Sequence, residues 1–84
     1  MVITQVIATE KFEKDVKKIK DKMIRERIDS EVKKICKNPD FGKGLRYGLK
    51  GEMTVRIAPY RMIYAVDDSK LILLRFEHRG DVYN

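Results

Sequence analysis

The residues best suited to chemistry gather in the run Glu77-His78-Arg79-Gly80-Asp81-Val82-Tyr83. A histidine side chain can transfer protons, so His78 is a candidate general acid or base. Arg79 can stabilise the charge of a phosphorane-like transition state. A partly exposed Tyr83 can stack on a nucleic-acid base. The structural alternative is a frayed chain end in which His78 rests against a sheet edge.

Two arginines on β-type segments could act on the same substrate. The apolar residues of segment 53–58 must face a core, so Thr54 and Arg56 point to the other side. Arg61 likewise points away from the apolar side of segment 60–66. Arginine binds phosphate through two parallel hydrogen bonds and stacks on bases, which lysine does not do. These positions therefore indicate an anion-binding face on a sheet.

Strict alternation divides the last strand and the residues after it between two sides. One side carries Leu71, Leu73, Arg75, Glu77 and Arg79, and the other carries Ile72, Leu74, Phe76 and His78. Arg79 can thus join Arg56 and Arg61 on one open face. The register between strands is not specified by the sequence, so the pattern permits this convergence and does not require it.

The N-terminal half predicts one strand and two helices. Residues 1–8 are rich in β-type residues, and Thr9 is placed as a helix N-cap. Two apolar stripes follow at helical spacing: Phe12, Val16, Ile19 and Met23, then Ile24, Ile28, Val32, Ile35 and Cys36. A helical hairpin with a break near Asp21-Lys22 is favoured over a single rod of about 29 residues, which is long for so small a domain. Asn38-Pro39-Asp40 ends the helical region.

From Leu45 onward the apolar period changes to two. Strands are predicted over 45–50, 53–58, 60–66 and 70–76, with a loop at 41–44 and a turn at 67–69. The most apolar of them, 70–76, is expected to be central. The chain is thus predicted to form a single α+β domain over residues 1–84. An N-terminal strand and a two-helix hairpin pack on one face of a mostly antiparallel sheet of about four to five strands.

Composition restricts the function classes. The 84 residues fit one domain, and 19 Lys and Arg against 13 Asp and Glu give a net charge of +6, which favours an anionic partner. No apolar run approaches the roughly 18 residues of a membrane span. Neither a signal peptide nor a cysteine cluster is present, and Cys36 and His78 are single. We expect a cytoplasmic protein without a metal site or cofactor.

Two motifs carry a family resemblance. The segments Val55-Arg56-Ile57-Ala58-Pro59-Tyr60-Arg61-Met62-Ile63-Tyr64 and His78-Arg79-Gly80-Asp81-Val82-Tyr83, in this order in a short basic chain, resemble the RelE/ParE superfamily of prokaryotic toxin–antitoxin toxins. The likeness is greatest to short archaeal RelE-type members and extends over nearly the whole chain. It implies a ribosome-dependent, metal-independent mRNA endonuclease that cuts in the A site. It also implies an inhibitory RelB-like antitoxin, together with the ribosome and mRNA as partners.

The resemblance also implies roles for individual residues. Arg61 is similar to the arginine that holds the scissile phosphate, and Arg56 takes the place of a basic residue on the neighbouring strand. Arg79 resembles the C-terminal arginine near the leaving 5′-oxygen. Tyr83 resembles the tyrosine that stacks on or orients the cut nucleotide.

The sequence also departs from the family pattern. Bacterial RelE enzymes have a lysine where this chain has Thr54, so either His78 or Tyr83 is expected to serve as the general base. Arg46, Lys50 and Thr54 are expected to bind substrate. The alternatives are a ParE-like inhibitor of DNA gyrase, and a catalytically silent antitoxin-binding or nucleic-acid-binding relative.

Overall fold

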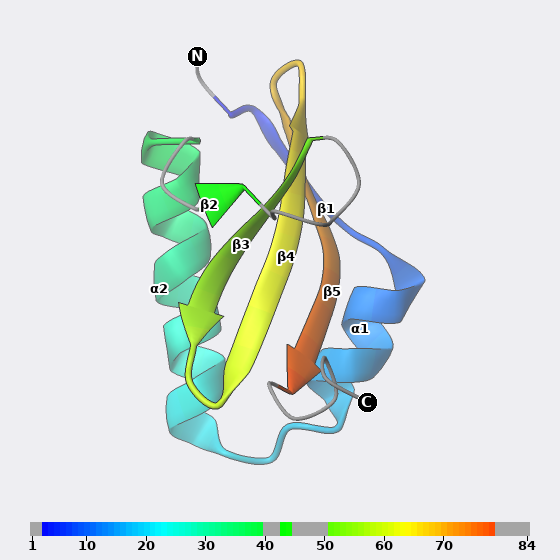
Figure 1. Cartoon of the computed structure of the whole chain (residues 1–84), viewed down its shortest axis with the longest axis vertical. Coiled ribbons are helices and arrows are strands. Elements are labelled where there is room, and N and C mark those ends of the chain that lie inside the picture. Colours follow the sequence, from blue (N-terminus) through cyan, green and yellow to red (C-terminus); the bar gives the residue numbers. More distant parts are fainter. Residues whose placement is uncertain (1–2, 40–42, 45–50, 79–84) are drawn as a thin grey trace.

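Figure 1 shows the computed structural model, which describes residues 3–39, 43–44 and 51–78. Two helices and five strands follow one another along the chain: β1 (Gln5–Ala8), α1 (Glu10–Lys17), α2 (Lys22–Lys37), β2 (Lys43–Gly44), β3 (Glu52–Ile57), β4 (Tyr60–Asp67) and β5 (Lys70–His78). The strands form one sheet in the order β1-β5-β4-β3-β2. β1 runs parallel to β5, and all other neighbours are antiparallel. The predicted α+β architecture is confirmed.

The helical hairpin is confirmed, and its break is where the sequence placed it. The Thr9 hydroxyl caps α1 by accepting from the Phe12 amide at 3.1 Å. The Asp21 carboxylate caps α2 by accepting from the Met23 amide at 2.9 Å. These side chains satisfy amides at the helix starts that have no partner within the helix. α2 ends at Lys37, directly before the predicted Asn38-Pro39 terminator.

One apolar stripe was assigned wrongly at its end. Phe12 is buried on α1, but Ile19 lies beyond the helix, in the connection, where it is 7% exposed. Met23, predicted to follow on the same stripe, is 73% exposed. The reason is that α1 stops at Lys17, so a spacing of four residues from Ile19 no longer marks one face of one helix.

The core lies between the two helices and one face of the sheet. Both helices and the three long strands contribute to it, through Phe12, Ile19, Ile24, Ile28, Ile35, Val55, Ile57, Met62, Tyr64, Leu71, Leu73 and Phe76. The hydroxyl of buried Tyr64 donates to the Pro39 carbonyl at 3.1 Å. This bond ties the centre of the sheet to the chain just after α2.

The pairing of β2 and β5 tests two of the strand predictions. The segment 41–44 was predicted as a loop, but Lys43–Gly44 pairs with β3 as β2. The predicted strand 45–50 lies outside the described residues. The last strand was predicted to be central; β5 is an interior strand, hydrogen-bonded to β1 on one side and to β4 on the other, and β4 is in the middle of the order.

The alternation predicted for β5 is wrong beyond Leu73, because the strand contains a bulge. Ile63 pairs with Arg75, while the next residue of β4, Tyr64, pairs with Leu73. Leu74 is therefore an extra residue, and the side-chain parity of β5 reverses across it. Before the bulge the odd-numbered residues face the helices. After it, Phe76 does so.

Two side chains attach α1 to the edge of β5 that β1 leaves uncovered. β1 ends at Ala8, opposite Leu73. From there the Thr9 hydroxyl donates to the Leu74 carbonyl at 2.7 Å, and Asp15 Oδ2 accepts from the Phe76 amide at 3.0 Å. Asp15 is 8% exposed. The helix thus supplies hydrogen-bond partners where a neighbouring strand is missing.

We expect Ile28→Asp to lower the free energy of unfolding by about 3 kcal/mol or more, because it places a carboxylate among apolar side chains. Met23→Asp, at an exposed position five residues earlier on α2, should change it by less than about 0.5 kcal/mol. Urea unfolding followed by circular dichroism measures both. Equal stability of the two variants would show that the core is assigned wrongly.

Asp15→Ala should destabilise the fold by about 1–3 kcal/mol, because it leaves the buried Phe76 amide without an acceptor. Asp29→Ala, which removes an exposed carboxylate from α2, is the matched control and should be nearly neutral. Thermal melting compares the two, and amide exchange at Phe76 reports the lost bond directly. Unchanged protection of that amide would contradict the assignment.

Candidate functional site

Three charged side chains form a row across the open face of the sheet, opposite the helices. Arg56 of β3 is the register partner of Arg61 of β4, and Arg61 is the partner of Glu77 of β5. Arg56 is exposed, whereas Arg61 and Glu77 are half-buried. Directly opposite side chains lie about 5 Å apart at their Cβ atoms. The predicted convergence of Arg56 and Arg61 on one face is thus seen in the structure.

The two arginines are like charges on neighbouring strands, and only Arg61 has a carboxylate, that of Glu77, as a register partner. Neither takes part in a hydrogen bond or ion pair within the part of the chain that the structure describes. Like charges directly opposite each other on neighbouring strands destabilise a sheet. A bound anion would relieve this repulsion and could accept hydrogen bonds from both guanidinium groups. This geometry suits a phosphate group.

Next to this row lies a rigid charged network centred on Arg75. Its Nη1 and Nη2 atoms donate to the two carboxylate oxygens of Glu52 at 3.2 and 2.9 Å, and its Nε donates to Glu77 Oε1 at 2.6 Å. The bonds to Glu52 raise the pKa of Arg75, burial opposes them, and the bond to Glu77 adds to the rise. The guanidinium is therefore held in its charged form, and it fixes the Glu77 carboxylate beside Arg61.

Thr54 lies on this face but does not present its hydroxyl. In the register it is the partner of Ile63, which is 1% exposed. The Thr54 Oγ1 atom is buried and has no hydrogen-bond partner among the described residues. Its predicted role in substrate binding would need this oxygen to become accessible.

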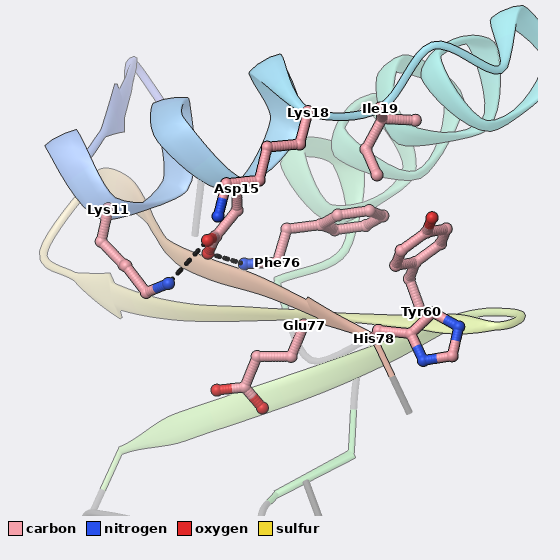
Figure 2. Close-up of a pocket in the computed structure, with 8 residues that line it drawn as sticks. All are labelled: Lys11, Asp15, Lys18, Ile19, Tyr60, Phe76, Glu77 and His78. Atoms are coloured by element: carbon pink, nitrogen blue, oxygen red, sulfur yellow. Dashed lines mark hydrogen bonds and ion pairs between the residues drawn. The ribbon is translucent and has the colours of Figure 1, made fainter. Parts of the chain in front are cut away.

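A pocket of about 710 Å³ opens on the other side of the sheet, between α1 and the ends of β4 and β5 (Figure 2). It is lined by Lys11, Asp15, Lys18, Ile19, Tyr60, Phe76, Glu77 and His78. The Tyr60 ring stacks on Phe76 at 4.9 Å and meets the His78 ring edge-on at 5.2 Å. Lys11 Nζ pairs with Asp15 Oδ1 at 2.6 Å.

His78 and the two arginines lie on opposite faces of the sheet. His78 is the register partner of Tyr60, whose ring packs against the core on the helix side. Arg61, the next residue after Tyr60, faces the opposite way. The structure therefore brings together Arg56 and Arg61 and places His78 on the other face.

Four of the predicted substrate-binding and catalytic residues lie outside the described residues: Arg46, Lys50, Arg79 and Tyr83. Among residues 3–39, 43–44 and 51–78, no group of three or more His, Cys, Asp or Glu side chains is placed to hold a metal ion. Within these same residues no helix is long and apolar enough to cross a membrane.

The sequence did not predict the two carboxylates beside the arginines, those of Glu52 and Glu77. Glu77 was visible in the C-terminal run, but strict alternation gave no reason to choose it. The partnership of Arg75 with Glu52 joins residues 23 positions apart, and it depends on a register that the sequence does not specify. The exposed Lys11 and Lys18 at the pocket were read only as part of the charged helix surface.

Comparison with known proteins identifies the family. The family model described as "ParE toxin of type II toxin-antitoxin system, parDE" matches residues 6–83. Toxin RelG of Mycobacterium tuberculosis is 41% identical over 44 residues, which are 50% of this chain and 51% of RelG. The match thus spans about half the length of this curated relative.

Two solved structures share the fold along nearly the whole chain. The RelBE2 toxin–antitoxin complex of Mycobacterium tuberculosis has a chain that is 27% identical, with a TM-score of 0.76 and coverage of 93% of this chain and 100% of that one. The RelB-RelE complex of Methanococcus jannaschii gives 23% identity and a TM-score of 0.75, covering 92% and 94%. Because the family model spans almost all of the sequence, the chain belongs to the ParE toxin family of type II toxin–antitoxin systems, within the RelE/ParE superfamily.

Proposed function

We propose that this toxin is a ribosome-dependent mRNA endonuclease that cuts in the A site and needs no metal ion. The observation that carries the proposal is the Arg56–Arg61 couple on the open face of the sheet, which has no ion-pair partner among the described residues. An RNA backbone offers a phosphate to such a couple. The net charge of +6 favours association with a ribonucleoprotein surface.

The chemistry assigned to this face is an internal phosphoryl transfer. The 2′-hydroxyl of one nucleotide attacks the adjacent phosphorus, and the bond to the 5′-oxygen of the next nucleotide breaks. Charge accumulates on the non-bridging oxygens in the transition state. Arg61 and Arg56 stabilise it, because both guanidinium groups can donate hydrogen bonds to the non-bridging oxygens of one phosphate.

Two further roles come from the family resemblance alone. Arg79 would lie near the leaving 5′-oxygen, and Tyr83 would stack on the cut nucleotide. Both follow His78, the last residue of β5, in the sequence. Arg46 and Lys50 would contribute further contacts to the RNA backbone.

The partner that restrains this activity would be a RelB-like antitoxin. The similar chains from Mycobacterium tuberculosis and Methanococcus jannaschii were solved as toxin–antitoxin complexes. A basic toxin suits an acidic segment that folds on binding. We place this segment over part of the helical hairpin and the open sheet face, where it would cover Arg56 and Arg61.

Inhibition of DNA gyrase is a second candidate, because the matching family model describes ParE toxins. It would make no use of phosphate chemistry on the open face. The arginine pair on that face is the reason to rank RNA cleavage first.

Arg61→Ala is expected to reduce mRNA cleavage by about two to three orders of magnitude while the protein stays folded, because a charge-stabilising donor is lost. Arg27→Ala, which removes an exposed arginine from α2, should cleave like the unsubstituted protein. Primer extension on mRNA in a translating extract measures both. Cuts within codons that require engaged ribosomes and vanish in Arg61→Ala would support the proposal.

Two results would contradict the proposed function or its site. Intact mRNA together with growth arrest would overturn the endonuclease assignment and favour gyrase inhibition, which a supercoiling assay tests. Full cleavage by Arg61→Ala would show that the arginine pair is not the site.

Antitoxin and RNA are expected to exclude each other, since both would occupy the face of Arg56 and Arg61. The measurement is displacement of a labelled RNA from the toxin by a stoichiometric amount of the co-encoded antitoxin. A ternary complex with unchanged RNA affinity would show that the antitoxin binds elsewhere.

A further inference from the structure

The proposed reaction needs a general base that accepts the proton of the 2′-hydroxyl. His78 and Tyr83 are the candidates from the sequence. The bulge at Leu74 turns His78 toward Tyr60 on the helix side of the sheet. A group that takes a proton from a ribose held by Arg56 and Arg61 must instead lie on the open face.

Glu77 is the carboxylate on that face nearest to the arginines in the register, directly opposite Arg61. Figure 2 shows its side chain on the opposite side of β5 from Asp15 and the Phe76 ring. The side chain is 30% exposed, so it is accessible to a substrate and yet partly fixed. Glu52, the other carboxylate in the charged network, is 7% exposed and uses both oxygens on Arg75.

The two oxygens of Glu77 have different surroundings. Oε1 accepts from Arg75 Nε at 2.6 Å. No hydrogen bond to Oε2 forms within the described part of the chain. Arg75 itself donates to both carboxylate oxygens of Glu52, so the residue that orients the Glu77 carboxylate is held in place by two further hydrogen bonds. One oxygen is thus anchored and the other is available to accept a proton.

We propose that Glu77 is the general base, with Arg75 and Glu52 as positioning residues. This rests on the proposed RNA cleavage. Glu77 Oε2 takes the proton of the 2′-hydroxyl as the 2′-oxygen forms its bond to phosphorus. The bond between phosphorus and the 5′-oxygen breaks, and that oxygen leaves with a proton from solvent. The products are a 2′,3′-cyclic phosphate and a 5′-hydroxyl.

Glu77→Gln is the direct test, because glutamine keeps an oxygen that can accept from Arg75 Nε and loses only the basic oxygen. Single-turnover cleavage of ribosome-bound mRNA is expected to slow by about 10²–10⁴-fold, the usual contribution of a general base. The pH profile should change as well. Once hydroxide must deprotonate the 2′-hydroxyl, the logarithm of the rate should rise with pH with a slope of about one, whereas the unsubstituted protein shows a flatter line. A purely structural role would not change this slope.

Asp67→Asn is the matched control. It converts an exposed carboxylate to an amide at the far end of the open face of β4, opposite Lys70, and should leave rate and slope unchanged. Thermal melting confirms that both variants fold.

Three results would overturn the assignment. Cleavage by Glu77→Gln at the original rate with the original pH profile would remove the role of Glu77 and leave the proposed function standing. The same would follow if His78→Gln, and not Glu77→Gln, produced the unit slope. Absence of cleavage by the unsubstituted protein would overturn both the proposed function and the role of Glu77.

Discussion

One extra residue in β5 decides which chemical groups share a face of the sheet. If β5 alternated strictly through Leu74, with no bulge, Arg75 and Glu77 would lie beneath the helices with Leu71 and Leu73, and Phe76 would lie on the open face. Burying those charges there would cost more than the domain could recover. With the bulge, Phe76 joins the core, while Arg75 and Glu77 emerge beside Arg61. Both the apolar packing under α1 and the charged row on the open face depend on this single irregularity.

The bulge also sets a requirement for α1. It lies where β1 ends, so the polar groups of β5 beyond Leu73 have no strand on that side. Thr9 and Asp15 supply the missing partners at Leu74 and Phe76. The N-cap of the helix thus serves two structures at once, because its hydroxyl accepts from the Phe12 amide and donates to the sheet. The position of α1 is therefore fixed by directional bonds as well as by apolar contact.

Local patterns in the sequence predicted the helices and most of the strands. The features that they did not predict depend on the register between strands that are far apart in the sequence. The helix break at Asp21, the terminator at Asn38-Pro39 and the outward position of Arg56 all follow from neighbouring residues. Side-chain parity in β5 could not be predicted, because a bulge is chosen by what packs on both faces and not by the strand's own residues. His78 was chosen as a candidate base for its residue type, and Glu77 was not considered, because its position opposite Arg61 depends on the register between β4 and β5. The family resemblance identified the toxin class, but it did not indicate the reversal of side-chain parity at Leu74.

The parallel pairing of β1 with β5 has a consequence for the order in which the molecule can form. Thr4 bonds to Ser69 and Thr9 to Leu74, each across 65 positions of sequence. During synthesis β1 emerges before both helices, yet it must wait for β5 before it has a neighbour in the sheet. Closing so long a loop is entropically slow. The row containing Glu77 is likewise absent until β5 joins β4, so it can form only after the residues of β5 have been synthesised.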